Sequence, residues 1–286
     1  NSPPTSEPLL SQLMNKTRTL VLGILLVSTN LFSQGTIDVP IVFPEDDRFL
    51  PRSWTQEPIS ASTVPLPPEN QKAARDILLK GLHKYPAAIA TKYLNEVCIV
   101  KSLKFYGVGY GGTYMANSKR VLLVYRPEFD SRGFEQRLHH EFSSILLKMN
   151  ESTFEEKRWL TANAPGFEYR AGGVIEEQSG DRSEATKVLA AEQKKTGGSG
   201  SSLLHLNAEL MTQGFLTPYN CVSVEQDVNE TVAHLFTNPE IWSLGVTYPR
   251  IDQKIDILID FFRALDPNMD RIYFRNLTRG DNASYP

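Results

Sequence analysis

A predicted helix over residues 131–150 constrains the fold more than any other segment of the chain. Asp130 or Ser131 can cap its start. Its apolar side chains recur at spacings of four, three and four, and form one stripe for a core: Leu138, Phe142, Ile145 and Met149. His140 and Ser144 share a neighbouring face, with Glu141 one step around, so these polar residues do not compete with the core for space.

The polar face of this helix has most of a metal-site pattern. Two histidines four residues apart on one helical face can hold zinc, and a glutamate beside the first can activate a metal-bound water. His140 and Glu141 fill the first two places, but Ser144 stands where the second histidine is expected. A serine hydroxyl is a poor zinc ligand at neutral pH, so zinc affinity is expected to fall unless another histidine compensates.

A second helical segment, from about Glu225 to Phe236, offers further ligands. Glu230 and His234 lie four residues apart, so both can point at one ion. Taken alone, an exposed helical pair explains them better. Their coincidence with His140 and Glu141 on an earlier helix favours a shared metal site.

The chain has five histidines, and two of them are set aside. His83 ends an amphipathic helix, where a surface or capping role is expected, and His205 has no acidic neighbour at ligand spacing. His139, His140 and His234 remain. Either His139 or His234 would be the nitrogen ligand that compensates for Ser144.

Composition indicates an ordinary globular protein, with 41% hydrophobic and 22% charged residues. The length suits one domain or two small ones. The formal net charge of -3 and the scattered Lys and Arg residues give no basic field for nucleic acid. We therefore expect no nucleic-acid partner, and the sequence does not specify an oligomeric state.

The N-terminus has the three parts of a secretory signal peptide. A basic start at Met14–Arg18 precedes an apolar run at Leu20–Val27 and a small, polar exit at Ser28–Gln34. The apolar run is short for a membrane span, although an uncleaved signal anchor is the alternative. We expect a secreted or periplasmic protein with no stable membrane insertion after cleavage.

Two cysteines, Cys98 and Cys221, can form one disulfide in an oxidising compartment or stay as separate buried thiols. Asn229 begins one of the four N-x-S/T sequons that lie beyond the signal segment, and a glycan there would obstruct the candidate site.

Three regions follow from the sequence. Residues 1–34 are an N-terminal extension and signal peptide, residues 35–68 a Pro-rich extended arm, and residues 69–286 one domain. Within the domain we expect strands at 97–106 and 120–125, and further helices over 69–85, 87–94, 154–160, 182–195 and around 251–262. The glycine-rich segment Gly107–Gly112 lacks a P-loop lysine and a following helix, so a turn or bulge between strands is the plainer interpretation.

Three segments resemble the zinc-binding metallopeptidases of the gluzincin group, which are zincin-like proteins. Leu138–Leu146 resembles that family's H-H-E-F-x-H-I-L helix, Gly214–Tyr219 its G-F-[VL]-[ST]-x-Y segment, and Gln226–Ala233 its E-D-F-A-E helix. The resemblance covers about residues 95–265. It implies an α+β, zincin-like fold with a small mixed sheet packed with an active-site helix and a C-terminal helical part.

Carried over by position, the resemblance makes His140 a zinc ligand and Glu141 the general base. Glu230 becomes the carboxylate ligand, with His234 as a support or a replacement ligand, and Tyr219 a group that stabilises an oxyanion. The first glutamate of E-D-F-A-E falls on Gln226. If that is the true ligand position, the site has lost two ligands.

Two functions follow. The first is a secreted zinc metallopeptidase acting on peptide or protein substrates, in which zinc polarises the scissile carbonyl and Glu141 takes a proton from the bound water. The alternative is a catalytically inactive, zincin-like binding or scaffold protein. A third interpretation, an accidental cluster on an unrelated α+β protein, is disfavoured by the order of the three segments.

Overall fold

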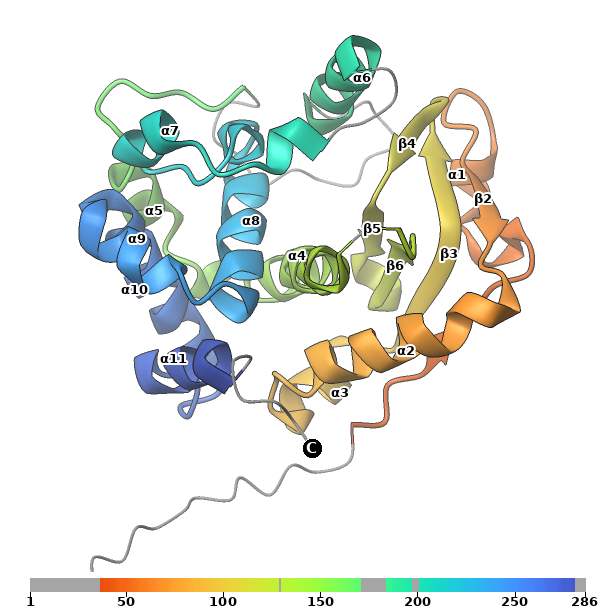
Figure 1. The fold of residues 1–286 in the computed structure, drawn as a ribbon, viewed down its shortest axis with the longest axis horizontal. Helices are drawn as coiled ribbons and strands as arrows, with labels where there is room; N and C mark the ends of the chain where they lie inside the picture. Colours follow the sequence, from red (N-terminus) through yellow and green to blue (C-terminus); the bar gives the residue numbers. More distant parts are fainter. Residues whose placement is uncertain (1–36, 129, 171–183, 197–200, 281–286) are drawn as a thin grey trace, which may run out of the picture. The chain divides into compact units, whose positions relative to one another are not determined.

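The structure is a computed structural model that describes residues 37–128, 130–170, 184–196 and 201–280 (Figure 1). The described residues belong to one compact unit. The signal-peptide prediction falls outside the described residues and stays a prediction. Within the described ranges, no helix is long and apolar enough to cross a membrane.

One mixed six-stranded sheet organises the unit, in the order β1-β3-β6-β5, with β2 and β4 also paired to β3. β1 and β6 run parallel to β3, whereas β2 and β4 are antiparallel to it and β5 is antiparallel to β6. The predicted α+β class with a small mixed sheet is confirmed. The strands are β1 Ile41–Val42, β2 Ser62–Pro65, β3 Glu96–Phe105, β4 Val108–Tyr110, β5 Gly112–Met115 and β6 Arg120–Val124.

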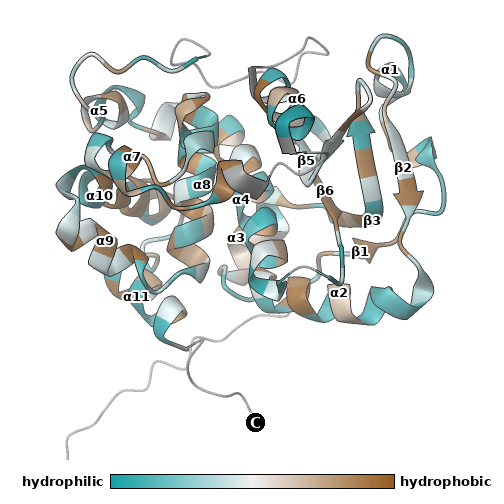
Figure 2. Cartoon of the chain, turned by 45° about the horizontal axis from the view of Figure 1, so that its top comes forward, coloured by the Kyte–Doolittle hydropathy of each residue, from teal (hydrophilic) through white to brown (hydrophobic). Residues whose placement is uncertain are grey.

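The central strand β3 is buried on both faces, which explains its continuous apolar run. Val97 and Ile99 point into the main core, while Cys98 and Val100 point into a smaller core on the other face. The pairing with β6 keeps this alternation, because each of these residues is opposite an equally buried Val or Leu. In Figure 2 both strands carry hydrophobic residues.

The glycine-rich segment joins strands, as predicted from the sequence. Tyr106 and Gly107, with φ of 52° and 75°, form the two-residue turn between β3 and β4. Left-handed backbone at both positions matches the twist of a tight hairpin. Gly112 begins β5, where a Cβ atom would lie 2.9 Å from the Glu141 Oε1 atom. A glycine at 112 therefore lets Glu141 lie against the sheet.

Most helices lie on the main-core side of the sheet, where the C-terminal half of the chain forms a larger helical part, whereas Trp54 of the first short helix packs against the smaller core. The helices are α1 Arg52–Thr55, α2 Pro68–Leu82, α3 Ala87–Tyr93, α4 Ser131–Met149, α5 Glu156–Thr161, α6 Glu184–Thr196, α7 Ala208–Gln213, α8 Val224–Thr237, α9 Ile241–Thr247, α10 Pro249–Leu265 and α11 Arg271–Gly280. Short 3-10 turns include η4 Ser201–Leu204 and η5 Pro218–Cys221.

Helix α4 lies between the sheet and α8 (Figure 1). The Asp130 side chain caps its start by accepting a bond from the backbone N–H of Arg132. Leu138, Phe142 and Ile145 are fully buried, whereas the predicted fourth member of the stripe, Met149, is 41% exposed at the helix end. The apolar stripe therefore fixes which face of α4 meets the core.

The segment expected as an extended arm supplies β1 and β2, both paired with β3. Cys98 in β3 and Cys221 in η5 are free thiols, the first buried and the second partly exposed. No disulfide joins them.

Candidate functional site

The crossing of α4 and α8 brings the predicted site residues of both helices together. His140 Nδ1 lies 3.0 Å from Glu230 Oε1, although the two residues are 90 positions apart in the sequence. A site shared between α4 and α8 requires a direct contact of this kind between their side chains.

Both ring nitrogens of His140 have partners. Nδ1 faces the Glu230 carboxylate, and Nε2 lies 3.0 Å from the Gln226 Oε1 atom. Burial lowers the pKa of His140, but the hydrogen bond and charge of Glu230 outweigh it, so the pKa is raised. Two oxygen acceptors on one imidazole favour the doubly protonated ring, which has no free nitrogen lone pair.

Glu141 lies one step around α4, close to four other titratable groups. Burial raises the pKa of its carboxyl to about 7, against the pull of His140 and Arg137, while Glu225 and Glu230 reinforce the rise. A carboxyl with this pKa can exchange a proton near neutral pH, which is the property required of a general base.

This raised pKa makes a measurable prediction. Glu141 should stabilise the folded chain at low pH, and that contribution should disappear as the pH rises from about 4.5 to about 7. At 1.36 kcal/mol per pKa unit, the loss is at most about 3 kcal/mol. Urea unfolding across this pH range should show the decline in the wild type and a smaller one in Glu141→Gln. Parallel curves for the two proteins would contradict it.

Ser144, at the place of the missing histidine, belongs to a polar network between the helices. Asn229 Nδ2 donates to Ser144 Oγ at 2.7 Å, and Ser143 Oγ donates to Asn229 Oδ1 at 2.6 Å. Ser144 and Tyr114 of β5 also hydrogen-bond the fully buried Glu225, whose pKa is raised by burial despite these bonds. Asn229 is 1% exposed, so a glycan at this sequon is incompatible with the fold.

Sequence reasoning missed Glu225, Asn229 and Tyr114. Asn229 and Glu225 flank the motif positions on α8, and the helical period alone could have placed them toward α4. Tyr114 lies on strand β5, far from α8 in the sequence, and no sequence motif marked it as a site residue.

His234 lies one turn beyond Glu230 on α8. Its Nδ1 atom is 3.2 Å from the Asn238 amide, and burial lowers its pKa. Its charged neighbours besides Glu230 are Arg132, near the start of α4, and Glu240. His234 is therefore placed beside Glu230, toward the beginning of α4.

His139 points to a separate buried network. Its Nδ1 atom lies 2.9 Å from the Tyr85 hydroxyl, and its Nε2 atom lies 3.3 Å from Glu135, which pairs with Lys84 at 2.8 Å. Burial alone would raise the pKa of Glu135, but His139 and Lys84 hold it at about 2. His139 is fully buried in this arrangement, so it does not compensate for Ser144.

Tyr219 of η5 stacks against His140, with 6.1 Å between ring centroids. Thr217 caps η5 through a reciprocal pair of bonds with Asn220. Tyr219 thus lies beside the predicted metal ligand, on a turn with a fixed start.

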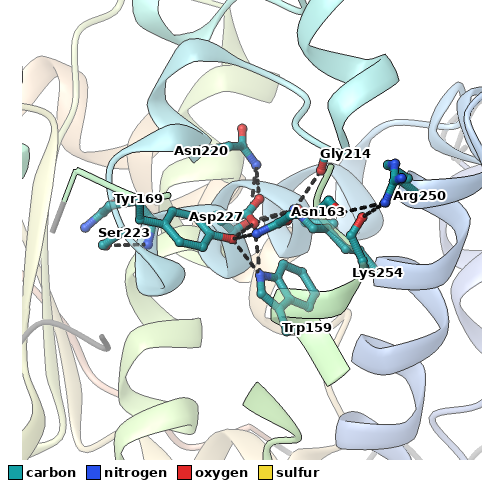
Figure 3. Close-up of polar contacts among 12 residues, drawn as sticks. Trp159, Asn163, Tyr169, Gly214, Asn220, Ser223, Asp227, Arg250 and Lys254 are labelled. Carbon is teal, nitrogen blue, oxygen red and sulfur yellow. Dashed lines mark hydrogen bonds and ion pairs between the residues drawn. The ribbon is translucent and has the colours of Figure 1, made fainter. Parts of the chain in front are cut away.

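A buried polar network holds α8 and η5 in place (Figure 3). One Asp227 oxygen accepts bonds from Lys254 at 2.5 Å, Tyr169 at 2.5 Å and Trp159 at 2.9 Å. The other oxygen accepts from Asn220 at 2.8 Å. Asp227 and Lys254 are fully buried, so the position of Tyr219, next to Asn220, depends on a satisfied ion pair.

The donor groups around His140 do not match the needs of a zinc ion. Zinc takes neutral imidazole, thiolate or carboxylate, and a catalytic site has three such ligands. Here His140 is bonded at both nitrogens, and the motif positions 144 and 226 carry a hydroxyl and an amide. In the part of the chain that the structure describes, no three His, Cys, Asp or Glu side chains are grouped to hold a metal. His140, Glu230 and His234 as zinc ligands stay a prediction.

The chain is similar to a crystal structure named "putative zinc-binding metallo-peptidase" from Bacteroides caccae ATCC 43185, with 17% sequence identity and a TM-score of 0.47. The match covers 75% of this chain and 77% of that one. No protein-family model matches the sequence. No curated protein matches it either.

Proposed function

We propose that this chain is a zincin-like protein in which direct hydrogen bonds replace the metal, and that it serves as a binding or scaffold protein without peptidase activity. The observation that supports this most is the placement of His140 between Gln226 and Glu230. The proposal also rests on the motif resemblance of α4 and α8.

The ring orientation of His140 favours position 226 as the third ligand position of the ancestral site. Its Nε2 atom faces Gln226, while its Nδ1 atom is held by Glu230. A metal-bound histidine commonly donates its other N–H to a carboxylate that orients the ring, and Glu230 suits that supporting role. Positions 144 and 226 have then both exchanged a metal ligand for a neutral side chain.

The new side chains hold the two helices together without an ion. Asn229 of α8 hydrogen-bonds Ser143 and Ser144 of α4. One turn earlier on both helices, Gln226 hydrogen-bonds His140. Buried polar groups are stable when each finds a partner, and these do. The cluster therefore has a structural role that zinc would otherwise fill.

The competing function is the metallopeptidase itself, with His140, Glu230 and His234 as ligands. The observation in its favour is Glu141, whose pKa of about 7 suits a general base beside His140 and Tyr219. A binding protein requires no proton acceptor there, although Gly112 shows that Glu141 also has a packing position against β5.

Zinc content and peptide cleavage distinguish the two functions. We expect the purified full chain, loaded with zinc and then dialysed to remove the free ion, to retain far less than one zinc per chain. We also expect it to cleave a mixed peptide library no faster than the Glu141→Gln variant does. Elemental analysis and mass spectrometry of the peptides measure both. One tightly held zinc per chain, with cleavage lost in Glu141→Gln, would establish the peptidase instead.

A further inference from the structure

Helix α6 lies beside β4 at the edge of the sheet (Figure 1). At the sheet edge, the Gln193 amide pairs with the backbone of Gly109 in β4. Its Oε1 atom accepts from the Gly109 N–H at 3.3 Å, and its Nε2 atom donates to the Gly109 carbonyl at 2.6 Å. Tyr110 adds a hydroxyl bond to Thr186 at 2.5 Å.

The Gln193 amide makes the same two hydrogen bonds to Gly109 that the backbone of a neighbouring strand would make. A planar side-chain amide offers one donor and one acceptor, as a peptide group does, so Gln193 satisfies backbone groups that β4 does not share with β3. A Cβ atom at Gly109 would lie 3.8 Å from both amide atoms. The β4 edge and α6 are thus fitted to each other.

The opposite face of α6 contacts the site, because Val188 lies about half a turn around the helix from Thr186 and Gln193. Val188 packs with Leu203, Tyr219 and Val222 in a small apolar cluster that is separate from the two larger cores. Tyr219 in turn stacks on His140. Through this cluster, α6 is therefore linked to the aromatic ring that stacks on His140.

These contacts are of a kind that opens locally. The side-chain hydrogen bonds lie on the face toward β4 and the small cluster lies on the opposite face, and among the described side chains of α6 Val188 is the buried apolar one. Segments with few buried apolar contacts open without unfolding of the main core.

We propose that α6 is a strap that closes over the candidate site, held by Gln193 at β4 and by Val188 at Tyr219, and that its release controls access to Tyr219 and His140. This device works whether or not the site holds zinc. Opening removes Val188 from Tyr219 and frees the outer backbone groups of Gly109 in the same motion.

Nitration of tyrosines by tetranitromethane, followed by peptide mass spectrometry, tests the strap. The measured quantity is the rate at Tyr219, which is 8% exposed when α6 is closed, relative to the partly exposed Tyr248 at the start of α10. Gln193→Ala should raise this ratio about fivefold or more, because it removes two hydrogen bonds of the closed form. Val188→Ala should also raise it, by weakening the contact on the opposite face of the helix.

Lys195→Ala is the matched control, since its side chain is 76% exposed on the same helix and should leave the ratio unchanged. Circular dichroism checks that each variant is folded. A ratio that stays at the wild-type value in both Gln193→Ala and Val188→Ala would overturn the strap. The nitration test does not depend on zinc content. The proposed function can therefore be disproved while the strap is confirmed, and the reverse.

Discussion

Ser144→His combined with Gln226→Glu is expected to give the chain a zinc site and to make its stability depend on zinc. Residues 140 and 144 lie one turn apart on one face of α4, and residue 226 already faces the Nε2 atom of His140 at 3.0 Å. The double variant would supply two imidazoles and a carboxylate, which is a complete donor set. Glu230 would orient His140 through its Nδ1 atom.

The metal-free form of this variant should be less stable than the wild type. Ser144 is 2% exposed, and a larger side chain at a buried position costs about 1 to 3 kcal/mol. Zinc at a hundred times its dissociation constant would raise the free energy of unfolding by about 2.7 kcal/mol. For a domain of this size, that corresponds to a rise in Tm of about 5 °C or more.

Thermal unfolding with zinc and with a chelator measures the effect. Ser144→Ala with Gln226→Glu is the control, because it removes the hydroxyl without adding a nitrogen ligand, and it should show a much smaller zinc shift. Two results would count against the interpretation. One is an equal zinc shift in the wild type; the other is a folded double variant that binds no zinc.

Asp227→Asn is expected to lower the free energy of unfolding by about 3 to 5 kcal/mol, because it leaves the buried Lys254 ammonium without its counter-charge. Burial already lowers the pKa of Lys254, and Asp227 opposes that shift. The remaining acceptor in contact with Lys254 is the Gly214 carbonyl at 2.7 Å. Urea unfolding at neutral pH measures the loss.

Two further variants make this prediction specific. Lys254→Met in the Asp227→Asn background should recover part of the loss, since it removes the stranded charge. Asp260→Asn disrupts a half-exposed pair with Arg158 and should change stability by less than about 1 kcal/mol. Equal losses for Asp227→Asn and Asp260→Asn would show that the buried pair has no special weight.

The sequence by itself determined most of the elements. Helical spacing predicted α2, α4, α8 and α10, alternation predicted β3, and a short apolar run predicted β6, since each of these has one consistently buried face or a fully buried run. The short elements α1, α9, β1 and β2 were not predicted. They have too few residues for a period to be visible, and they form because β3 or the helical part lies beside them.

For the site, the sequence named His140, Glu141, Tyr219 and Glu230 as neighbours, and the structure brings His140 to Glu230 and to Tyr219. It also identified Ser144 and Gln226 as departures from a metal-binding pattern. Spacing within one helix fixes which residues share a face, so these parts could be read from single segments.

Only the tertiary structure decided what each polar side chain contacts. His139 and His140 are adjacent in the sequence, yet one is locked between Tyr85 and Glu135 and the other between Gln226 and Glu230. Tyr85 comes from the turn after α2, and Gln226 and Glu230 come from α8, so no local pattern encodes these three contacts, whereas Glu135 lies one turn before His139 on α4 itself. Protonation follows from those contacts, so whether His140 offers a lone pair to a metal is a property of the packing of α4 against α8.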